Sequence, residues 1–314
     1  MNEKTLVICD KEARYAKGLG DNFSERKEFA FKVYACTSAE SVRCFLDSHR
    51  IDVLIIDEGF GWEERESFGA EITFVLTKGI CRDLKVDEVE LFKYQCADAI
   101  LADVVESYLR KSNVTILKNI KKQSKKMIAV YSPVKRIGKS TFAAALCREL
   151  GKEKKTLFLN MESYPSSAEG GKNLGDLLYY IRQEQDELGA RLASMVKSRD
   201  GLEYLLPIPM ISDLKEVTVN EWKNLLERIL EESIYENLVI DLDDSVDGLL
   251  EILKLCDWVY MPVLEEEVSH QKVCRFEEVL TCLGLEDILR KTTRFNAPED
   301  MEGYARKLVR EDEV

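Results

Sequence analysis

Short apolar runs alternate with amphipathic segments through the first third of the chain. Each run is rich in Val, Ile, Leu or Phe, which is typical of buried β-strands. The runs that predict strands are Thr5 to Cys9, Phe31 to Ala35, Val53 to Ile56, Ile72 to Leu76 and Val89 to Phe92. Between the first of these, Lys11 to Phe23 and Ala39 to His49 have helical spacing. Such alternation predicts a parallel sheet with right-handed crossovers, and the short connections after the third and fourth runs predict that the helices there are shortened or absent.

The same alternation returns on a larger scale after residue 126. The segments that predict strands are Met127 to Tyr131, Thr156 to Asn160, Leu238 to Ile240 and Trp258 to Val263. The segments that predict helices are Lys139 to Leu150, Leu174 to Ile181 and Val219 to Glu232. We expect this second sheet to be parallel as well. The closing segment from Met301 onward is expected to form a capping helix or a frayed tail.

Length and local charge divide the chain into two domains. The chain has 314 residues, of which 45% are hydrophobic and 33% charged, and this suits about two globular domains. Residues 113–126 hold five Lys and no acidic residue, and their apolar positions follow no fixed period. We therefore expect an α/β protein with two doubly wound parallel-sheet domains, at 1–112 and 127–314, joined by a basic linker at 113–126. The linker is either a solvated tether or a patch for a membrane surface or nucleic acid.

Overall charge and cysteine usage argue against several classes of protein. The formal net charge of −13 argues against a protein that binds nucleic acid over its whole surface, because such binding needs a basic face. The nine Cys form no Cys-x-x-Cys pair and have no His partners, so neither a zinc site nor a disulfide framework is expected. No apolar run reaches the roughly 18 residues of a membrane-spanning helix, and the N-terminus lacks the pattern of a secretory signal. We expect a cytoplasmic protein whose membrane contact is only indirect or peripheral.

Four polar residues close predicted strands in the first domain. Asp10, Asp57, Thr77 and Lys93 follow or end the first, third, fourth and fifth strands. In an open parallel sheet the carboxyl ends of the strands meet at one edge, where ligands gather. This set resembles the receiver domain of response regulators, which has a flavodoxin-like fold. The resemblance implies a phosphorylatable Asp57, a Mg²⁺-binding Asp10, a hydroxyl at Thr77 and a Lys93 that neutralises the phosphoryl group.

The first domain also departs from the receiver pattern. Asp10 is followed by Lys11 where receivers have a second acid, and Lys93 is followed by Tyr94 where they have Pro. Together with the shortened helices, these changes favour an atypical receiver that serves as a protein-docking domain. Phosphorylation of Asp57 is the alternative.

A Gly-Lys-Ser turn opens the second domain. The segment after the first strand reads SPVKRIGKST and runs directly into a helix, as in the closing half of a P-loop. Gly138 lets the backbone approach phosphates, Lys139 reaches the β and γ oxygens and Ser140 holds Mg²⁺. The residues expected at the nucleotide are Pro133, Val134, Lys135, Arg136, Ile137, Gly138, Lys139, Ser140 and Thr141.

This domain resembles the MinD/ParA class of ATPases, which carries a deviant Walker A loop. The two central glycine positions of that loop are taken by Lys135 and Arg136, and the additional Lys of the class is displaced by one place. The resemblance implies ATP and Mg²⁺ as cofactors. It also implies catalytic roles for Lys139, for Glu162 at the acidic switch and for Asp241, which closes a strand that resembles Walker B and would orient the metal.

Two departures from this class bear on activity. Asn160 stands where the class usually has an Asp, and the glycine positions of the loop hold bulkier residues. Only Gly reaches positive φ without strain, so the loop has less conformational freedom. We therefore expect ATP binding with weak hydrolysis at most.

The order of the two domains resembles the TadZ/CpaE branch, in which an atypical receiver precedes such an ATPase domain. The segments LGDLLYYIRQ and GLEYLLPIPMISDL are also similar to that branch. The resemblance implies an ATP-binding, dimerising localisation or assembly factor for a tight-adherence (Flp, type IV-like) pilus or a secretion apparatus. Its partners would be a second copy of the chain and pilus or secretion machinery, with recruitment to the inner face of the membrane or a cell pole.

Two other functions stay open. One is a catalytically inactive two-domain scaffold. The other is a ParA-like partition ATPase that contacts DNA without sequence specificity. The basic residues that would serve it are Lys118, Lys121, Lys122, Lys125 and Lys126. The excess of acid over base in residues 127–314 argues against this alternative, so no specific nucleic-acid partner is expected.

Overall fold

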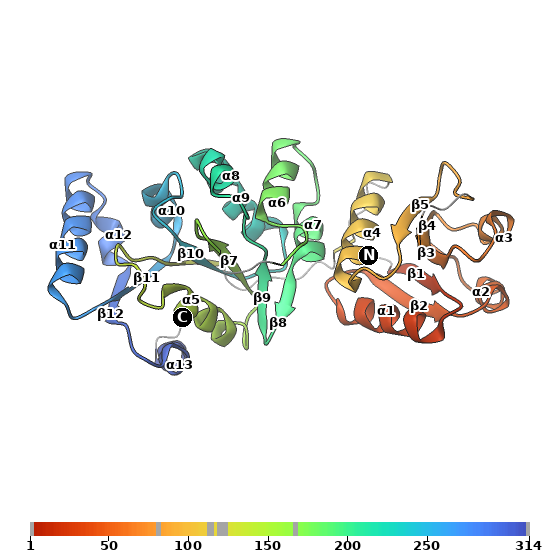
Figure 1. Cartoon of the computed structure of the whole chain (residues 1–314), viewed down its shortest axis with the longest axis horizontal. Coiled ribbons are helices and arrows are strands. Elements are labelled where there is room, and N and C mark those ends of the chain that lie inside the picture. The colour runs from red at the N-terminus through yellow and green to blue at the C-terminus, as the bar shows by residue number, and fades with distance from the viewer. Residues whose placement is uncertain (1–2, 80–82, 112–115, 118–124, 166–168, 312–314) are drawn as a thin grey trace. The chain divides into compact units, whose positions relative to one another are not determined.

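The computed structural model describes residues 3–79, 83–111, 116–117, 125–165 and 169–311 (Figure 1). The chain forms two compact units, Met1–Ile120 and Lys121–Val314. No helix in the described ranges is long and apolar enough to cross a membrane.

Unit 1 is an α/β fold with a five-stranded sheet in the order β2-β1-β3-β4-β5. Every strand pair in it is parallel. Its elements are β1 Lys4–Cys9, α1 Ala13–Glu25, β2 Phe31–Cys36, α2 Ala39–Leu46, β3 Val53–Asp57, α3 Trp62–Ser67, β4 Ile72–Thr77, β5 Val89–Phe92 and α4 Ala97–Lys111. This is the predicted doubly wound architecture, and the strand order matches the flavodoxin-like type.

Burial explains why the central strand of unit 1 could be predicted from the sequence. The central strand β3 is buried at every residue, so it reads as a continuous apolar run. Figure 1 shows α1 and α4 on one face of the sheet and α2 and α3 on the other. As expected, α3 is short, with 6 residues. The described residues between β4 and β5 form no helix.

Two residues of the predicted linker pack onto unit 1. Ile116 and Leu117 are buried, Leu117 forms an antiparallel bridge with Phe29, and the Ile116 carbonyl accepts the N–H of Ala30 at 2.7 Å. The structured part of unit 1 thus extends past residue 112. At the other end of the predicted linker, Lys126 already belongs to the first strand of unit 2. Lys118, Lys121 and Lys122 lie outside the described residues.

Unit 2 has a seven-stranded sheet in the order β12-β11-β6-β10-β7-β9-β8. Its strands are β6 Lys126–Val130, β7 Thr156–Met161, β8 Lys197–Arg199, β9 Leu202–Leu205, β10 Asn237–Leu242, β11 Trp258–Val263 and β12 Thr292–Asn296. Its helices are α5 Lys139–Leu150, α6 Leu174–Arg182, α7 Leu188–Met195, α8 Ile211–Glu216, α9 Val219–Glu232, α10 Leu249–Leu255, α11 Glu267–Cys282, α12 Glu286–Arg290 and α13 Met301–Glu311. The prediction of a fully parallel sheet is wrong at one edge, where β8 runs antiparallel to β9.

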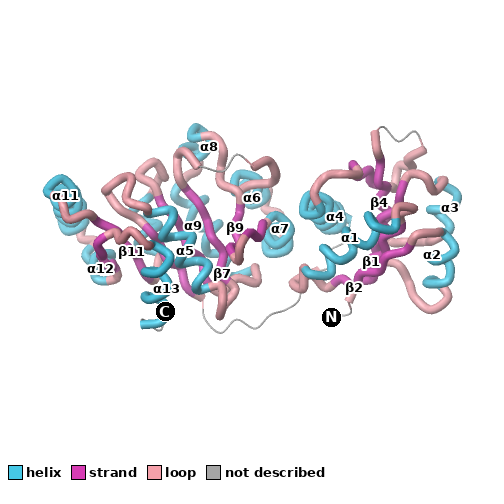
Figure 2. Tube along the Cα trace, turned by 60° about the horizontal axis from the view of Figure 1, so that its bottom comes forward, coloured by secondary structure: helices cyan, strands magenta, loops and turns pink. Residues whose placement is uncertain are grey.

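The strands of unit 2 send alternate side chains into two cores, as the period of a strand requires. In β6, Met127 and Ala129 join the core beneath α6, α7, α9 and α10. Ile128 and Val130 join the core beneath α5 and α13. Helices therefore cover both faces of the sheet, which Figure 2 shows from a second direction. The C-terminal segment is the expected capping helix, α13, which packs on α5.

Candidate functional site

The turn between β6 and α5 is the segment for which the sequence predicts a phosphate loop. Gly138 stands at the N-cap of α5 with φ 75°. A Cβ there would come within 2.8 Å of Met301 Cε, the end of a flexible side chain that can shift, so it is the backbone angle that requires glycine. Arg136 also has positive φ, at 58°, although it is not a glycine. The Val134 N–H donates to Ser132 Oγ at 3.1 Å and helps to fix the start of the loop.

Three adjacent strands bring the predicted catalytic residues together. In the sheet register Asp241 of β10 pairs with Val130 of β6 and with Asn160 of β7, so the carboxyl ends of these strands are level. Lys139 Nζ contacts Asp241 Oδ1 and lies 3.3 Å from Glu162 Oε1. The hydroxyl of Ser140 donates to the same Glu162 oxygen at 2.8 Å. A lysine, a hydroxyl and two carboxylates from separate segments thus converge.

The Asp241 carboxylate is the most enclosed of these groups. Its residue is 0% exposed, and burial raises its pKa above the ordinary value although Lys139 opposes the shift. Its second oxygen, Oδ2, is buried and accepts no hydrogen bond from the described residues. A buried carboxylate oxygen without a donor suits a divalent cation or a water bound to one. The donor set of Ser140 and Asp241 therefore fits Mg²⁺.

Lys135 forms a second cation–carboxylate cluster next to the first. Its Nζ lies 2.6 Å from Asp243 Oδ1 and 2.9 Å from Asp244 Oδ2, two residues that follow β10. The hydroxyl of Tyr131 donates to Asp244 at 2.8 Å. Burial acts against ionisation of Asp243, but hydrogen bonds from Lys135 and Ser163 lower its pKa to about 2. In this structure Lys135 therefore contacts carboxylates of its own chain.

Sequence reasoning missed the acidic loop after β10 as part of the site. Ser163, two residues after the end of β7, donates its hydroxyl to Asp243 at 2.9 Å and shares a 2.5 Å hydrogen bond with Ser245. The run Asp-Leu-Asp-Asp-Ser at residues 241–245 was a usable signal, since it places three acids where the strand ends. Only the first of them was assigned a role.

The remaining predicted loop residues divide by burial. Val134 and Ile137 are buried in the hydrophobic core, whereas Thr141 is exposed. Pro133 is half-buried. The Glu162 N–H donates to the Asn160 side-chain oxygen at 2.9 Å, and this hydrogen bond helps to fix the chain at the end of β7.

A cavity of about 580 Å³ lies at the carboxyl ends of β11 and β12 and the start of α11. Its wall includes Leu264, Glu266, His270, Phe295 and Asn296. Because β11 is the neighbour of β6 in the sheet, the cavity lies on the strand that flanks the phosphate loop. Apolar and polar groups are mixed in its lining, as in sites for small organic ligands.

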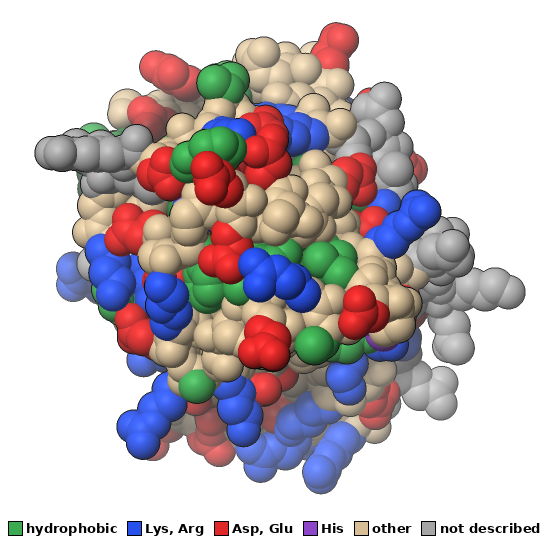
Figure 3. All heavy atoms as spheres, turned by 90° about the vertical axis from the view of Figure 1, so that its right-hand side faces the viewer, with side chains coloured by type: hydrophobic (Ala, Val, Ile, Leu, Met, Phe, Trp, Pro, Cys, Tyr) green, Lys and Arg blue, Asp and Glu red, His purple; other side chains and the backbone are tan. Residues whose placement is uncertain are grey.

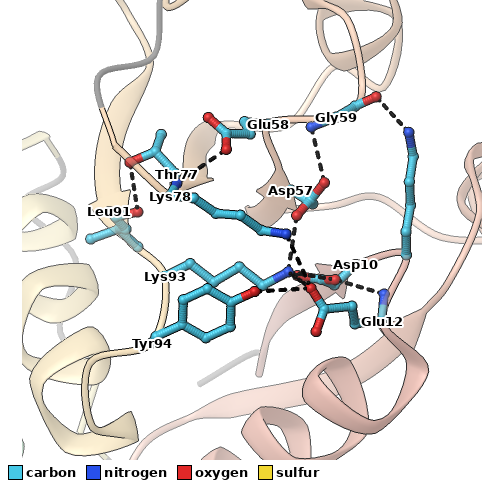
Figure 4. A network of polar contacts seen from close by, with 11 residues as sticks. Asp10, Glu12, Asp57, Glu58, Gly59, Thr77, Lys78, Leu91, Lys93 and Tyr94 are labelled. Carbon is cyan, nitrogen blue, oxygen red and sulfur yellow. Dashed lines mark hydrogen bonds and ion pairs between the residues drawn. The ribbon is translucent and has the colours of Figure 1, made fainter.

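Unit 1 gathers its strand-end residues around a buried lysine. Lys93 is 0% exposed, and its Nζ lies 2.8 Å from Asp10, 3.0 Å from Asp57 and 2.9 Å from Glu12 (Figure 4). Burial lowers the pKa of Lys93, but these carboxylates outweigh it and hold the pKa above the ordinary value. The sequence predicted three members of this group and missed Glu12.

Two other residues of unit 1 behave differently from the receiver pattern. Figure 4 shows the Thr77 hydroxyl directed at the Leu91 carbonyl, at 3.5 Å, rather than at Asp57. Lys11 donates to the Gly59 carbonyl at 2.7 Å, and its ammonium lies 4.9 Å from the centre of the Phe60 ring. The predicted Asp10, Asp57 and Lys93 are therefore brought together, and Thr77 is adjacent but turned away.

Comparison of the sequence with protein-family models gives no match, and comparison with curated proteins gives none either. Several solved structures are similar. A plasmid partition protein from Borrelia burgdorferi has 18% identity, covering 60% of this chain and 97% of its own, with a TM-score of 0.44. A ParA family ATPase from Chlorobium tepidum has 14% identity, covering 61% and 95%, with a TM-score of 0.43.

The MinC:MinD cell division protein complex of Aquifex aeolicus is a further neighbour. It has 14% identity, covering 60% of this chain and 90% of its own, with a TM-score of 0.39. The structural neighbours thus include partition proteins, a ParA family ATPase and MinD. At these identities the likeness concerns the α/β fold alone.

Proposed function

We propose that this chain is an ATP-binding localisation or assembly factor that dimerises with ATP bound. The observation that carries this proposal is the convergence of Lys139, Ser140, Glu162 and Asp241 at the carboxyl ends of β6, β7 and β10. A loop that leads into the N-terminus of a helix, next to a lysine and metal-binding oxygens, is suited to a nucleoside triphosphate with Mg²⁺.

Each residue has a physical role in this proposal. When bound, Mg²⁺ would offset the negative charge of the phosphates. Ser140 and Asp241 would hold the ion, and the unpartnered Oδ2 of Asp241 supports this assignment. Lys139 would exchange its carboxylate contacts for phosphate oxygens. The cavity beside His270 and Asn296 would accept the base and ribose.

We expect hydrolysis to be slow. Asn160 has no carboxylate with which to orient an attacking water, and Glu162 is engaged by both Ser140 and Lys139. Arg136 holds a left-handed backbone conformation that glycine would adopt without strain. These features favour a protein whose state of assembly depends on bound nucleotide, rather than an enzyme that hydrolyses ATP rapidly.

Unit 1 would supply the docking surface for a partner in a tight-adherence pilus or a secretion apparatus. The domain order, an atypical receiver-like unit before a P-loop unit, supports this assignment. Figure 3 shows a face on which basic and acidic side chains are interspersed with small hydrophobic patches. Exposed aromatic residues of unit 1 include Phe92 at 54% and Tyr94 at 57%, which suits contact with another protein.

Isothermal titration calorimetry of the full chain with MgATP tests the proposal. We expect binding by the wild type and at least about ten-fold weaker binding by Lys139→Ala, because the variant loses a charge-assisted hydrogen bond to phosphate. Lys152→Ala is the matched control, since Lys152 lies past the opposite end of α5 and pairs only with Glu149 among the contacts described.

Two results would contradict the nucleotide assignment. One is an absence of MgATP binding by the wild type, which would favour a scaffold function. The other is equal affinity for the wild type and Lys139→Ala, which would place any bound nucleotide away from the phosphate loop. A Lys152→Ala variant as weak as Lys139→Ala would show a non-specific charge effect.

A further inference from the structure

A cavity of about 530 Å³ lies beside α5 on the outer part of the unit 2 sheet. The strands β7 and β9 form its floor, and Phe158 of β7 stands next to Tyr204 of β9 in the sheet register. In the strand order β11-β6-β10-β7-β9, this floor and the cavity beside His270 lie on opposite sides of β6 and β10. The cavity is therefore distinct from the one proposed for the base and ribose.

The helices of this face explain why there is space beside β9. The helix α5 packs against β6, β10, β7 and β9, and α13 packs on α5. Tyr304 of α13 stacks on Phe295 of β12, so α13 lies toward the other edge of the sheet. Phe158, Leu202 and Tyr204 belong to the core on this face, and their side chains therefore point toward it. They line the cavity on the side of α5 that faces away from α13.

The floor of the cavity suits an apolar or aromatic group. Phe158 and Leu202 are buried among their neighbours and Tyr204 is half-buried. Leu205 and Pro207 continue the apolar lining toward the carboxyl end of β9. Aromatic side chains on adjacent strands offer a surface on which a planar ring or an acyl chain packs, and the volume lies within the range of sites for small organic ligands.

Arg148 of α5 supplies a cation to this apolar lining. Its Nη1 lies 3.3 Å from Glu302, whose side chain is 64% exposed. Its Nε is buried and donates to no acceptor among the described residues. An exposed ion pair of this kind contributes little to stability, so Arg148 can exchange it for another anion at small cost. A ligand carboxylate would give the guanidinium the planar acceptor that suits its geometry.

The other charged residues of the lining are engaged with basic or acidic neighbours. Glu169 accepts a hydrogen bond from Lys197 at 3.1 Å, which lowers the pKa of Glu169 below its ordinary value. Arg199 lies 3.6 Å from Glu169 and 3.9 Å from Asp200. Both acids of the lining thus have cations beside them, which reduces their repulsion of an anion bound at Arg148.

We propose that this cavity binds a small amphipathic anion, an aromatic or acyl carboxylate, with its apolar body on β7 and β9 and its carboxylate at Arg148. An uncharged apolar ligand would leave Arg148 without a new acceptor, and an inorganic anion would leave the apolar floor uncovered. Asn160 lines the cavity and offers a polar contact to a substituent of the ligand. Since Lys139, Ser140 and Asp241 do not line it, the site does not depend on nucleotide binding.

Calorimetric titration of the full chain with para-benzoylbenzoate, a carboxylate with two aromatic rings, tests the proposal. We expect Arg148→Met to bind this probe about ten-fold more weakly than the wild type, because methionine keeps an apolar side chain but loses the charge-assisted hydrogen bond. Arg306→Met is the matched control and should bind as the wild type does. Arg306 is an exposed arginine of the neighbouring α13 that contacts Glu149 and does not line the cavity.

A neutral analogue separates the charge of the probe from its shape. The affinity for para-benzoylbenzamide should be the same in the wild type and in Arg148→Met, because this analogue has no carboxylate for the guanidinium to bind. If circular dichroism shows that Arg148→Met does not fold, Arg148→Gln takes its place. It is uncharged but still polar, and it should show the same weaker binding of para-benzoylbenzoate.

Photo-cross-linking with para-benzoylbenzoate locates the site, since an irradiated benzophenone forms a covalent bond to a nearby C–H group. Peptide mass analysis should find the probe on α5, β7 or β9. Leu202→Trp places a larger side chain in the cavity while Arg148 is retained, and it should reduce both the affinity and the cross-linking.

Several outcomes would overturn the proposal. They are a wild type that does not bind para-benzoylbenzoate, a folded Arg148→Met or Arg148→Gln with unchanged affinity, and an equal loss of affinity in Arg306→Met. An equal loss of para-benzoylbenzamide binding in Arg148→Met would assign the effect to shape rather than to charge. Cross-links absent from α5, β7 and β9, or a folded Leu202→Trp that binds as the wild type does, would place the probe outside this cavity.

Discussion

Arg136 is a residue of the phosphate loop whose backbone conformation is strained. With φ 58° it occupies the left-handed region, where the Cβ of a non-glycine residue crowds the following carbonyl. Its side chain is exposed, and no described contact offsets this cost. A bulky residue at this place reshapes the loop without removing the lysine or the hydroxyl that follow it.

Replacing Arg136 with glycine should therefore stabilise the folded chain. We expect Arg136→Gly to raise the free energy of unfolding of unit 2 by about 1 kcal/mol, because glycine adopts positive φ without steric strain. Urea unfolding followed by circular dichroism measures the change. Arg136→Ala is the control, since it removes the charge but keeps the Cβ, and it should give no such gain. Equal stabilisation by both variants would assign the effect to charge rather than to backbone strain.

At the scale of single residues, the sequence predicted those groups whose place follows from a strand end. Asp10, Asp57 and Lys93 in unit 1 and Asp241 in unit 2 all stand where an apolar run stops, so the place of each at the edge of its own sheet could be expected. Glu12 could not be placed in this way, because it belongs to the start of a helix and reaches the site only through the direction of its side chain.

At the scale of elements, the strands of unit 2 that the sequence predicted are the more buried ones. β6 and β10 are apolar runs buried on both faces, and they are the centre of the unit 2 sheet. β8, β9 and β12 were missed because they lie toward the edges and carry charged or polar residues that are exposed or half-buried. Periodicity is weak in such short strands, and only pairing with a neighbour defines them.

Arg65 stabilises the connection between β4 and β5, where the described residues form no helix. It is 1% exposed, and its guanidinium donates to Glu88 at 2.6 and 2.8 Å. It also donates to the backbone carbonyls of Phe60 and Asp83, each at 2.6 Å. The buried Arg65 of α3 thus links the chain after β3 to the β4–β5 connection. In that connection the described residues have no helix hydrogen bonds to order them.

We expect Arg65→Ala to lower the free energy of unfolding of unit 1 by about 3 kcal/mol, because the Glu88 carboxylate loses its buried cation and keeps only the Lys85 N–H, and two carbonyls lose the guanidinium donor. Native-state hydrogen exchange of peptides from β3 and β4 measures the loss, and peptides from β6 and β10 report whether unit 2 is affected. Arg43→Ala removes an exposed partner of Glu64, with the Arg43 side chain 58% exposed. It should cost less than about 1 kcal/mol. A similar small cost for Arg65→Ala would show that the β4 to β5 connection is ordered by other contacts.

At the scale of the whole molecule, the proposed dimer depends on where Lys135 points. In this structure its ammonium is neutralised by Asp243 and Asp244 of the same chain. Two bound triphosphates that face each other would repel, and a cation on the loop between them lowers that repulsion. Lys135 and Arg136 are the exposed cations of this loop. A triphosphate would compete with Asp243 and Asp244 for Lys135, so dimerisation through this face should require nucleotide.

We therefore expect the wild type to be monomeric without nucleotide and dimeric with MgATP, as measured by light scattering. Lys135→Ala combined with Arg136→Ala should shift the MgATP-bound protein toward monomer more than either single change, because each cation offsets part of the same repulsion. The matched control is Lys152→Ala combined with Lys155→Ala. Both lysines are exposed and lie just before β7, so they are at the amino ends of the strands, away from the phosphate loop. The control should remain dimeric with MgATP. If the double variant of the loop also stays fully dimeric, the two nucleotide faces do not form the dimer, because removing both cations would have left their phosphates unshielded.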